Sequence, residues 1–505
     1  MPEPLPRGQA PFDTAGIERD DHGIAHYTGL APSVVAVVRE SVERHPRVEA
    51  VVEVGGERLT YSELWHRARR VAGGLTGGGL ARGDRVALLL PAGADWICAF
   101  LGTLLAGGVV VPVNTRFAEP EIRHVLDDSG AAAVLRPGEA LPDGSPRAVP
   151  DPEPGELAAI FYTSGTTGAP KGARTTHENF LSNVETARRC LGLDPDEGPS
   201  VRSLVSVPLF HVTGCNSQLL VQLALGGTTV VLPEFRVRDF LRTVRDERIT
   251  ALVSVPAVYA LALARQDLAE FDLSGVTRVT YGGAPIAPAL VRRIQQHFPR
   301  AEVGNGFGLT ETSSIATYLP HAWAAEHADS VGFAAPVVDL ALAEVDGRGV
   351  GELLVRGPNV VDGYWNRPEE TVWTFADGWL RTGDLARVDD GLVRVVDRAE
   401  DVINRGGENV YSVEVENALA GAPGVADAAV VAVPDPVLGE KVGAVLVPSG
   451  ELDVRTVLEH LAGQLADFKV PQHVAVTTEP LPRNPGGKLL KREIRESTEW
   501  PAPVR

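Results

Sequence analysis

The clearest indication of the fold comes from one loop, which reads Tyr162-Thr163-Ser164-Gly165-Thr166-Thr167-Gly168-Ala169-Pro170-Lys171-Gly172. It follows an apolar run, residues 157–161, that is typical of a buried strand. Glycines let backbone N–H groups approach an anion, hydroxyls add donors, and the lysine adds a point charge. The order differs from that of the common P-loop, in which glycine precedes the lysine and serine or threonine follows it. We predict that this loop binds nucleotide phosphates; the alternative is an ordinary polar turn.

Lysine is rare in this chain, because five of its 47 cationic residues are lysines and the others are arginines. Arginine therefore supplies the general positive charge, and each lysine suggests a specific role. This strengthens the prediction for Lys171 and draws attention to Lys488.

On both sides of the loop, from about Leu59 to Leu385, apolar strand-like runs alternate with amphipathic helical stretches. This alternation predicts an α/β fold with parallel sheets. A helix is expected to run to Leu75 with Ser62 as its N-cap. The runs expected to form strands are 85–90, 228–232 and 251–255, and the run 351–357 is expected in a β-rich subdomain.

The length of 505 residues exceeds one ordinary core, so we expect at least two domains. The sequence changes character at the charged segment 397–401. We therefore predict a large N-terminal domain, residues 1–397, and a small α+β domain, residues 398–505. The second should contain a helix at 414–420 and strands at 428–433 and 442–447.

Composition excludes several classes of protein. A formal net charge of −19 argues against nucleic acid and anionic lipid as partners. The acidic N-terminal residues do not read as a signal peptide, and three widely spaced cysteines fit a reducing cytoplasm without disulfides or zinc. Residues 96–113 are uncharged and about long enough to span a bilayer. Gly107, Gly108 and Pro112 interrupt this run, so we predict a buried helix, a turn and a buried strand instead.

The loop at 162–172 resembles the signature loop of the adenylate-forming superfamily, which includes acyl-CoA synthetases, aryl-CoA ligases, luciferases and peptide-synthetase adenylation domains. Further ordered motifs extend this resemblance over nearly the whole chain. They are Pro208–Gly214, Tyr281–Pro285, Gly304–Thr312, Thr382–Asp384, Ile403–Tyr411 and Pro482–Leu490. The resemblance implies a large adenylation domain followed by a small mobile domain.

The resemblance also implies which residues bind ATP, with Lys171, Glu311 and Lys488 among the catalytic groups. Glu311 and Thr167 are the expected Mg²⁺ ligands, and carboxylate and hydroxyl oxygens suit this ion. A carboxylate at position 384 suits a ribose diol. The remaining expected nucleotide contacts are Thr163, Ser164, Gly165, Thr166, Gly168, Gly283, Ala284, Pro285, Asn305, Gly306, Phe307, Gly308, Thr310 and Arg398.

His211 is a further catalytic candidate, expected to shape the acid pocket; from the residue alone, a histidine beside Phe210 and Val212 more often packs in a core. The other expected acyl contacts are Val212, Gly214, Cys215 and Gly282. Glu400 falls at the hinge position, and the expected CoA contacts are Arg405, Gly406, Gly407 and Glu408. The chain departs mildly from the family pattern at Asn305, Phe307, Glu400 and Arg405.

We therefore expect an acid–CoA ligase that uses ATP, Mg²⁺ and coenzyme A and acts on an apolar acid, in the first place a fatty acid. An aryl-CoA ligase is an alternative that the sequence leaves open. A stand-alone enzyme that loads a carrier protein, a half-reaction specialist and a non-catalytic nucleotide sensor are the other readings. The segment from His211 to Gln218 contains no acidic residue for a substrate ammonium and no arginine for a dicarboxylate. The sequence leaves the oligomeric state open, a homodimer included.

Overall fold

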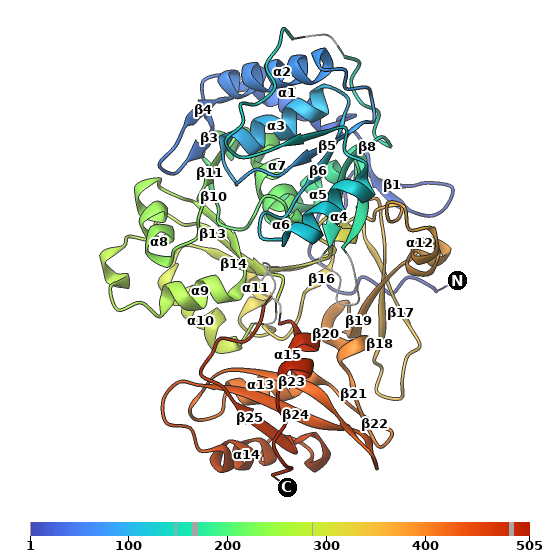
Figure 1. Cartoon of the computed structure of the whole chain (residues 1–505), viewed down its shortest axis with the longest axis vertical. Helices are drawn as coiled ribbons and strands as arrows, with labels where there is room; N and C mark the ends of the chain where they lie inside the picture. Colours follow the sequence, from blue (N-terminus) through green and yellow to red (C-terminus); the bar gives the residue numbers. More distant parts are fainter. Residues whose placement is uncertain (1, 147–148, 164–169, 285, 484–488, 505) are drawn as a thin grey trace.

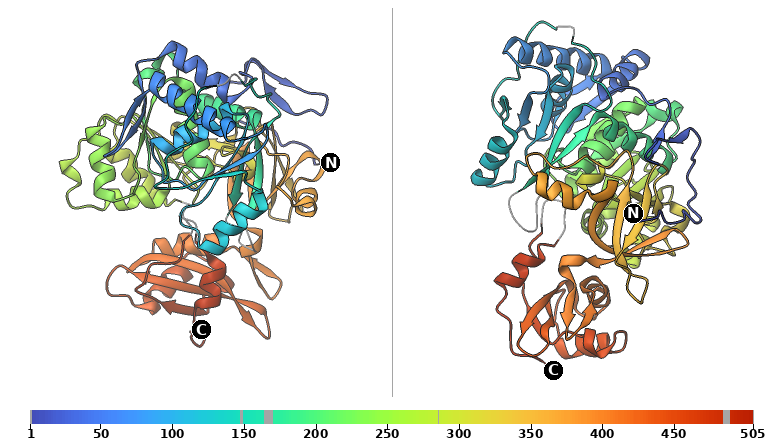
Figure 2. Two further views of the ribbon diagram at one scale, coloured as in Figure 1. Left: turned by 45° about the horizontal axis from the view of Figure 1, so that its top comes forward. Right: turned by 90° about the vertical axis from the view of Figure 1, so that its right-hand side faces the viewer.

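The computed structural model describes residues 2–146, 149–163, 170–284, 286–483 and 489–504. In Figure 1 the chain forms a large upper body and a smaller lower one, and the lower body holds the C-terminal elements from β21 onward. Figure 2 shows from two further sides that the smaller body is attached at one end of the larger one.

The largest sheet has nine strands in the order β16-β15-β14-β13-β12-β10-β11-β3-β4. Its six central strands are parallel, and its edges are antiparallel. The strands are β3 (Glu49–Glu53), β4 (Arg58–Thr60), β10 (Arg202–Val205), β11 (Thr228–Val231), β12 (Ala251–Ser254), β13 (Arg278–Gly282), β14 (Glu302–Phe307), β15 (Thr317–Leu319) and β16 (Phe333–Ala334).

A second sheet has the order β7-β5-β6-β8-β9 and is parallel except for the last pair. Its strands are β5 (Arg85–Leu88), β6 (Val109–Pro112), β7 (Ala133–Leu135), β8 (Leu157–Thr163) and β9 (Lys171–Thr176). The last two strands form the arms of the predicted phosphate loop.

Helices cover both sheets, as buried parallel strands require. They are α1 (Val34–Arg44), α2 (Tyr61–Gly77), α3 (Ala94–Leu105), α4 (Glu119–Ser129), α5 (His177–Cys190), α6 (Val212–Gly214), α7 (Leu220–Leu225), α8 (Val237–Asp246), α9 (Pro256–Leu263), α10 (Pro288–His297), α11 (His321–Ala324) and α12 (Pro368–Thr374). A π-helical turn, Cys215–Leu219, joins α6 to α7.

The β-rich subdomain predicted around residue 351 is a four-stranded antiparallel sheet. Its strands are β17 (Asp339–Ala343), β18 (Gly351–Arg356), β19 (Leu380–Asp389) and β20 (Leu392–Arg398). A small hairpin, β1 (Ile17–Arg19) and β2 (Ala25–Tyr27), stands apart from these sheets.

After β20 the chain builds a separate sheet in the order β22-β21-β24-β23, with β25 parallel to β24. Its own apolar core includes Val415, Leu446 and Leu461. The elements are β21 (Ile403–Arg405), β22 (Glu408–Val410), α13 (Ser412–Ala420), β23 (Val425–Asp435), β24 (Gly439–Pro448), α14 (Val454–Ala462), β25 (His473–Val476) and α15 (Lys491–Ser497). β20 ends at Arg398, one residue beyond the boundary that we propose between the two domains.

The apolar run 96–113 is a buried helix, a turn and a buried strand, as predicted. Helix α3 ends at Leu105, Gly107 turns the chain with a φ of 74°, and β6 begins at Val109. No helix in the described part of the chain has the length and apolar character needed to cross a membrane.

One predicted helix start is wrong by two residues. The N-cap of α2 is Thr60 rather than Ser62, and Thr60 forms a capping box with Glu63. Both hydroxyl residues satisfy the sequence preference for an N-cap, but only Thr60 has Glu at the third position after it, which allows the reciprocal bond.

Candidate active site

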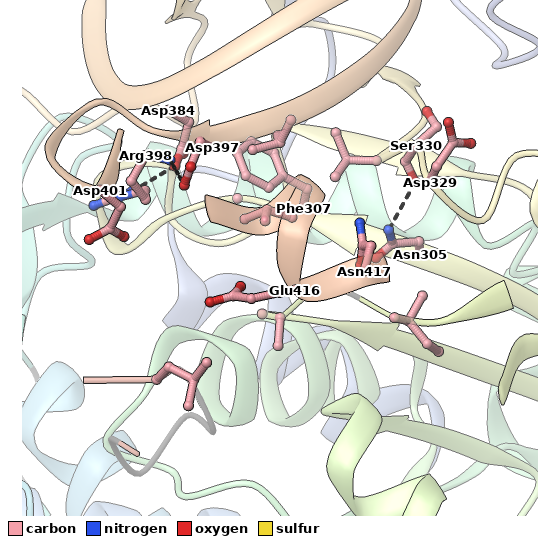
Figure 3. Close-up of a pocket in the computed structure, with 18 of the residues that line it drawn as sticks. Asn305, Phe307, Asp329, Ser330, Asp384, Asp397, Arg398, Asp401, Glu416 and Asn417 are labelled. Atoms are coloured by element: carbon pink, nitrogen blue, oxygen red, sulfur yellow. Dashed lines mark hydrogen bonds and ion pairs between the residues drawn. The ribbon is translucent and has the colours of Figure 1, made fainter. Parts of the chain in front are cut away.

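The first cavity lies where β13 and β14 end at the carboxyl edge of the large sheet, a usual ligand position in open α/β folds. It has a volume of about 320 Å³. Figure 3 shows Asn305, Phe307, Asp384 and Arg398 gathered around it. The larger body lines it with Gly283, Ala284, Ile286, Asn305, Gly306, Phe307, Gly308, Leu309, Ala328, Asp329, Ser330, Val331, Asp384, Val395, Asp397 and Arg398.

Close backbone packing requires two glycines here, Gly308 in the wall and Gly282, which precedes the lining residue Gly283 and itself lines neither cavity among the described residues. A Cβ on Gly282 would lie 2.2 Å from the carbonyl oxygen of Gly306. A Cβ on Gly308 would lie 1.4 Å from the carbonyl oxygen of Ser314. Such distances forbid a side chain at either position, so the backbone itself forms this part of the wall beside Phe307.

The loop after β14 carries Thr310 and Glu311 and contains two non-glycine residues with positive φ, Ser313 at 52° and Ser314 at 115°. Such conformations are sparsely populated and persist where the surroundings hold them. The buried Asn359 holds this turn by donating from Nδ2 to the carbonyl oxygens of Thr312 (3.1 Å) and Ile315 (3.0 Å).

Two further buried amides hold the same turn from α5 and the π-helical turn. Asn216 donates from Nδ2 to the carbonyl oxygen of Ser313 at 3.0 Å. Asn183 accepts the backbone N–H of Ile315 at 3.0 Å and donates to the carbonyl oxygen of Asn216 at 3.1 Å. The loop of Glu311 is therefore fixed by side chains from three separate elements.

A buried ion pair occupies the expected ribose side of the cavity. Asp384 on β19 accepts from Nη1 of Arg398 on β20 at 2.8 Å, and Asp384 is 4% exposed. Burial lowers the pKa of Arg398, but the charge and hydrogen bond of Asp384 outweigh this and raise it. The Arg398 guanidinium is thus charged in the folded protein, and it holds the Asp384 carboxylate at the cavity wall.

The described parts of the predicted phosphate loop end at Thr163 and resume at Pro170, which precedes Lys171. The Thr163 hydroxyl donates to the backbone oxygen of Lys171 at 3.4 Å. The Lys171 ammonium lies 5.6 Å from the ring centre of Tyr364, and the Tyr364 hydroxyl donates to Oε1 of Glu311 at 2.6 Å. Lys171 and Glu311 are therefore brought together by a residue that the sequence reasoning missed.

Glu311 fits the role of a magnesium ligand. Mg²⁺ is usually bound through one or two carboxylates together with substrate phosphates and water. The Tyr364 hydroxyl occupies Oε1, and the described residues donate no hydrogen bond to Oε2. One hard oxygen of Glu311 thus has no hydrogen-bond donor among the described residues.

His211 does not line the first cavity, although Gly283 and Phe307 do. It begins the turn into α6 and packs against Phe210, with ring centres 4.8 Å apart. Burial, helped by the positive charge of Arg116, lowers the pKa of His211 to about 4. Its Nε2 is buried and has no hydrogen-bond partner among the described residues. His211 is therefore a neutral imidazole with one ring nitrogen to spare.

A second cavity of about 220 Å³ lies between the two parallel sheets, next to Phe210. Val212, Gly214 and Cys215 are buried and line neither cavity among the described residues. The second cavity is lined by Leu90, Pro91, Ala92, Trp96, Thr115, Arg116, Ser206, Val207, Pro208, Leu209, Phe210, Leu232, Pro233, Phe235, Ser254, Val255 and Val258.

The smaller body also lines the first cavity, through Asp401, Val413, Glu416, Asn417, Arg483, Leu489 and Lys491. Lys491 pairs with Glu416 at 2.9 Å, and both side chains are largely buried. Burial raises the pKa of Glu416, and Lys491 offsets only part of that effect. Lys491 is one of the five lysines, so the rarity that highlighted Lys171 could also have revealed it.

The glycine loop expected to contact CoA lies in the smaller body and does not line either cavity. Arg405 and Glu408 are backbone register partners at the end of the β21–β22 hairpin. Between them, Gly406 and Gly407 have φ values of 62° and 92°. The Gly406 N–H donates to the carbonyl oxygen of Leu438 at 2.8 Å. Glu400 precedes this hairpin, 4.0 Å from Nε of Arg398.

Several predicted contacts lie outside the described residues. They are Ser164, Gly165, Thr166, Thr167, Gly168, Pro285 and Lys488.

Comparisons with known proteins agree with this arrangement. The model of the AMP-binding enzyme family matches residues 38–365, and that of the AMP-binding enzyme C-terminal domain matches residues 414–488. A feruloyl-CoA synthase of an Amycolatopsis species is 39% identical over 472 residues, which cover 88% of this chain and 95% of that protein. The long-chain-fatty-acid–CoA ligase FadD13 of Mycobacterium tuberculosis is 34% identical over 498 residues, which cover 91% and 97%.

Among solved structures, the o-succinylbenzoate CoA synthetase (MenE) of Bacillus subtilis, in complex with its acyl-adenylate intermediate OSB-AMP, superposes with a TM-score of 0.84. The two chains are 28% identical, and the alignment covers 93% of this chain and 99% of the other. Matches of this length and identity assign the chain to the AMP-binding, adenylate-forming enzyme family, in the branch of the acyl-CoA synthetases.

Proposed function

We propose that the protein is an acid–CoA ligase that uses ATP to turn a carboxylic acid into an acyl-adenylate and then transfers the acyl group to coenzyme A. The observation that carries this proposal is the first cavity, which joins a backbone-lined wall to the Asp384–Arg398 pair and to groups of the smaller body. The names of the relatives, which are CoA synthases and CoA ligases, support the same reaction.

We assign the nucleotide contacts as follows. Adenine lies against the backbone wall beside Phe307, and the ribose hydroxyls donate to the Asp384 carboxylate. Lys171 faces the departing phosphates. Negative charge develops on their oxygens during the displacement, and a fixed cation stabilises it. Glu311 would hold Mg²⁺, which neutralises phosphate charge when bound.

Lys488 is our proposed partner for the acid carboxylate and the α-phosphate. The sequence places it three residues before Lys491, whose side chain lines the first cavity. In-line displacement at phosphorus depends on positioning and countercharge more than on covalent help, and two convergent lysines supply both.

The acid is proposed to be apolar, with a fatty acid as the first candidate. The second cavity supports this, because Leu90, Phe210, Leu232, Phe235 and Val258 are among the residues that line it. His211, which is neutral because its pKa is low, packs against Phe210 of this cavity and adds no charge that would attract a second carboxylate.

An aryl acid is the second candidate. The observation that favours it is the 39% identity to the Amycolatopsis feruloyl-CoA synthase, compared with 34% to the fatty-acid ligase. The second cavity also contains the hydroxyl groups of Thr115, Ser206 and Ser254, which are able to form hydrogen bonds with the phenol group of such an acid.

The test is a panel of saturated acids of increasing length and of hydroxycinnamic acids, each supplied with ATP, Mg²⁺ and CoA. Thioester is measured by mass spectrometry and AMP by chromatography. Thioester from one class identifies the substrate, whereas AMP release without any thioester would reject CoA as acceptor and favour a carrier protein.

Two lysine variants test the assignment of the adenylation step. Lys171→Gln should lose pyrophosphate–ATP exchange by at least about a hundredfold, as loss of a charge-stabilising donor does. Lys441→Gln is the control, because Lys441 pairs with Asp435 at 2.7 Å and does not line the cavity among the described residues. Equal exchange by both variants would contradict the assignment.

A further inference from the structure

The segment 359–365 connects the two loops that carry the charged groups of the site. On one side, the Val361 N–H donates to the backbone oxygen of Glu311 at 2.9 Å. On the other, the Arg174 N–H donates to Gly363 at 3.1 Å and the Trp365 N–H donates to Gly172 at 2.7 Å. This segment therefore fastens the turn of Glu311 to the β9 arm of the phosphate loop.

Tyr364 makes the same connection through its side chain. Its hydroxyl donates to Oε1 of Glu311 at 2.6 Å, and its ring centre lies 5.6 Å from the Lys171 ammonium. A short hydrogen bond to a carboxylate fixes the orientation of that carboxylate. A ring face at this distance attracts a cation, so one side chain contacts both charged groups.

The position of the Tyr364 ring is itself fixed by α12 and the residue that follows it. Its backbone N–H donates to Oγ1 of Thr371 at 3.0 Å. The ring packs edge-on against Phe375, with centres 5.4 Å apart. Gly363 allows this approach, because a Cβ there would lie 2.4 Å from Cγ2 of Thr371. The ring is therefore held by three neighbours that carry no charge.

Because the Tyr364 hydroxyl donates to Oε1, the second carboxylate oxygen of Glu311, Oε2, receives no hydrogen bond from the described residues.

We propose that Tyr364 is a positioning residue that sets the Glu311 carboxylate and the Lys171 ammonium relative to each other, so that both meet one metal-bound nucleotide. This inference rests on the proposed function. The Tyr364 hydroxyl would orient a metal ligand, Glu311, through a hydrogen bond. Loss of such a contact typically weakens metal binding about ten- to a hundredfold.

The test separates the hydroxyl from the ring. Tyr364→Phe removes the hydrogen bond to Glu311 and keeps the ring beside Lys171, and Tyr364→Leu removes both. Tyr27→Phe is the matched control. The Tyr27 hydroxyl bonds to Oγ1 of Thr186 at 2.9 Å and its ring lies 4.6 Å from the Arg189 guanidinium, but it belongs to the hairpin strand β2.

Binding of ATP is measured by titration calorimetry with Mg²⁺ and, separately, with EDTA. Tyr364→Phe should weaken binding of Mg²⁺–ATP about tenfold and leave binding of metal-free ATP within a factor of about two. Tyr364→Leu should also weaken binding of metal-free ATP, by about two- to fivefold, since Lys171 loses its ring face. Tyr27→Phe should bind both forms as the parent does.

Parental affinity of Tyr364→Phe for Mg²⁺–ATP would overturn the inference and leave Tyr364 a packing residue. An equal loss with and without Mg²⁺ would overturn it as well. Tyr364→Phe is expected to fold normally and decides the question even if Tyr364→Leu unfolds. A parent protein that binds no ATP would instead reject the proposed function, so the two failures are distinguishable.

Discussion

Among single residues, Asp384 is the one whose role is most closely defined by its surroundings. Its carboxylate is 4% exposed and lies 2.8 Å from Nη1 of Arg398. A buried carboxylate that keeps its charge is stabilised by its partner and can still accept hydroxyl donors. Changing this one group should therefore affect nucleotide binding before it affects anything else.

Asp384→Asn should raise the KM for ATP in pyrophosphate exchange by about one to two orders of magnitude, the usual cost of a lost hydrogen bond to a charged group. Asp389→Asn is the control, because Asp389 pairs with Arg387 at 2.9 Å on the surface and both side chains are about half exposed. An unchanged KM for ATP in Asp384→Asn would remove Asp384 from the ribose site.

A second prediction at this scale concerns His177, which is 2% exposed and accepts the Val34 N–H at 3.3 Å. Burial lowers its pKa from 6.5 to about 4, and the nearby Glu156 and Arg82 modify this less. As the pH falls, the imidazole of residue 177 is protonated in the unfolded chain before it is protonated in the folded one. Its contribution to the free energy of unfolding is therefore complete above pH 6.5 and is lost as the pH falls toward 4.

Between pH 7 and pH 5 the loss amounts to about 2 kcal/mol of the free energy of unfolding. Urea denaturation at both values measures it. His177→Asn keeps an acceptor for Val34 and does not titrate, so its drop should be smaller by about that amount. An equal drop in the variant would show that His177 is not the group responsible.

At the scale of the element, the loop after β14 shows how the position of Glu311 is held. Its turn at Ser313 and Ser314 has positive φ, and the amides of Asn183, Asn216 and Asn359 hold it. The carbonyl oxygen of Ser314 then lies against Gly308. The loop and the end of the strand therefore form one packed unit.

Two neighbouring glycines test this unit. Gly308→Ala places a methyl group 1.4 Å from the Ser314 oxygen and should force the loop out of place, with a loss of about 2–5 kcal/mol in the free energy of unfolding and of ATP binding. Gly306→Ala meets its nearest atoms at 3.8 Å, which is ordinary contact, and should change thermal unfolding little. A similar melting temperature for both variants would contradict the packing argument.

At the scale of the whole molecule, the two bodies meet around the link between β20 and β21. Asp397, at the end of β20, accepts from the Ser412 hydroxyl at 2.9 Å, at the start of α13. The Lys491 ammonium contacts the same serine hydroxyl and Glu416. We infer that rotation about residues 398–402 would carry Lys491 and the β21–β22 hairpin together.

Lys488→Ala should therefore divide the two half-reactions. Pyrophosphate exchange should fall by at least about a hundredfold, because the carboxylate and α-phosphate lose their cation. Conversion of a supplied acyl-adenylate and CoA to thioester should remain within a factor of about five, since no phosphate is displaced in that step. Comparable losses in both assays would place Lys488 in both steps, against our assignment.

Much of this organisation could be predicted from the sequence. The alternation of apolar runs indicated the α/β class, and the glycines at 107 and 108 correctly excluded a membrane helix. Tyr364 could not be found this way, because its partners Glu311 and Lys171 lie far away in the sequence and nothing local marks the residue. The capping error at Ser62 has a different cause, since Thr60 and Ser62, two residues apart, both satisfied the same rule.

The first cavity takes its walls from both bodies, among them Ile286 and Ala328 of the larger one and Glu416 and Lys491 of the smaller one. A molecule that fills it contacts both bodies at once and therefore links them. A calorimetric scan should accordingly show the two bodies melting independently without nucleotide and merging into one sharper endotherm when ATP is present.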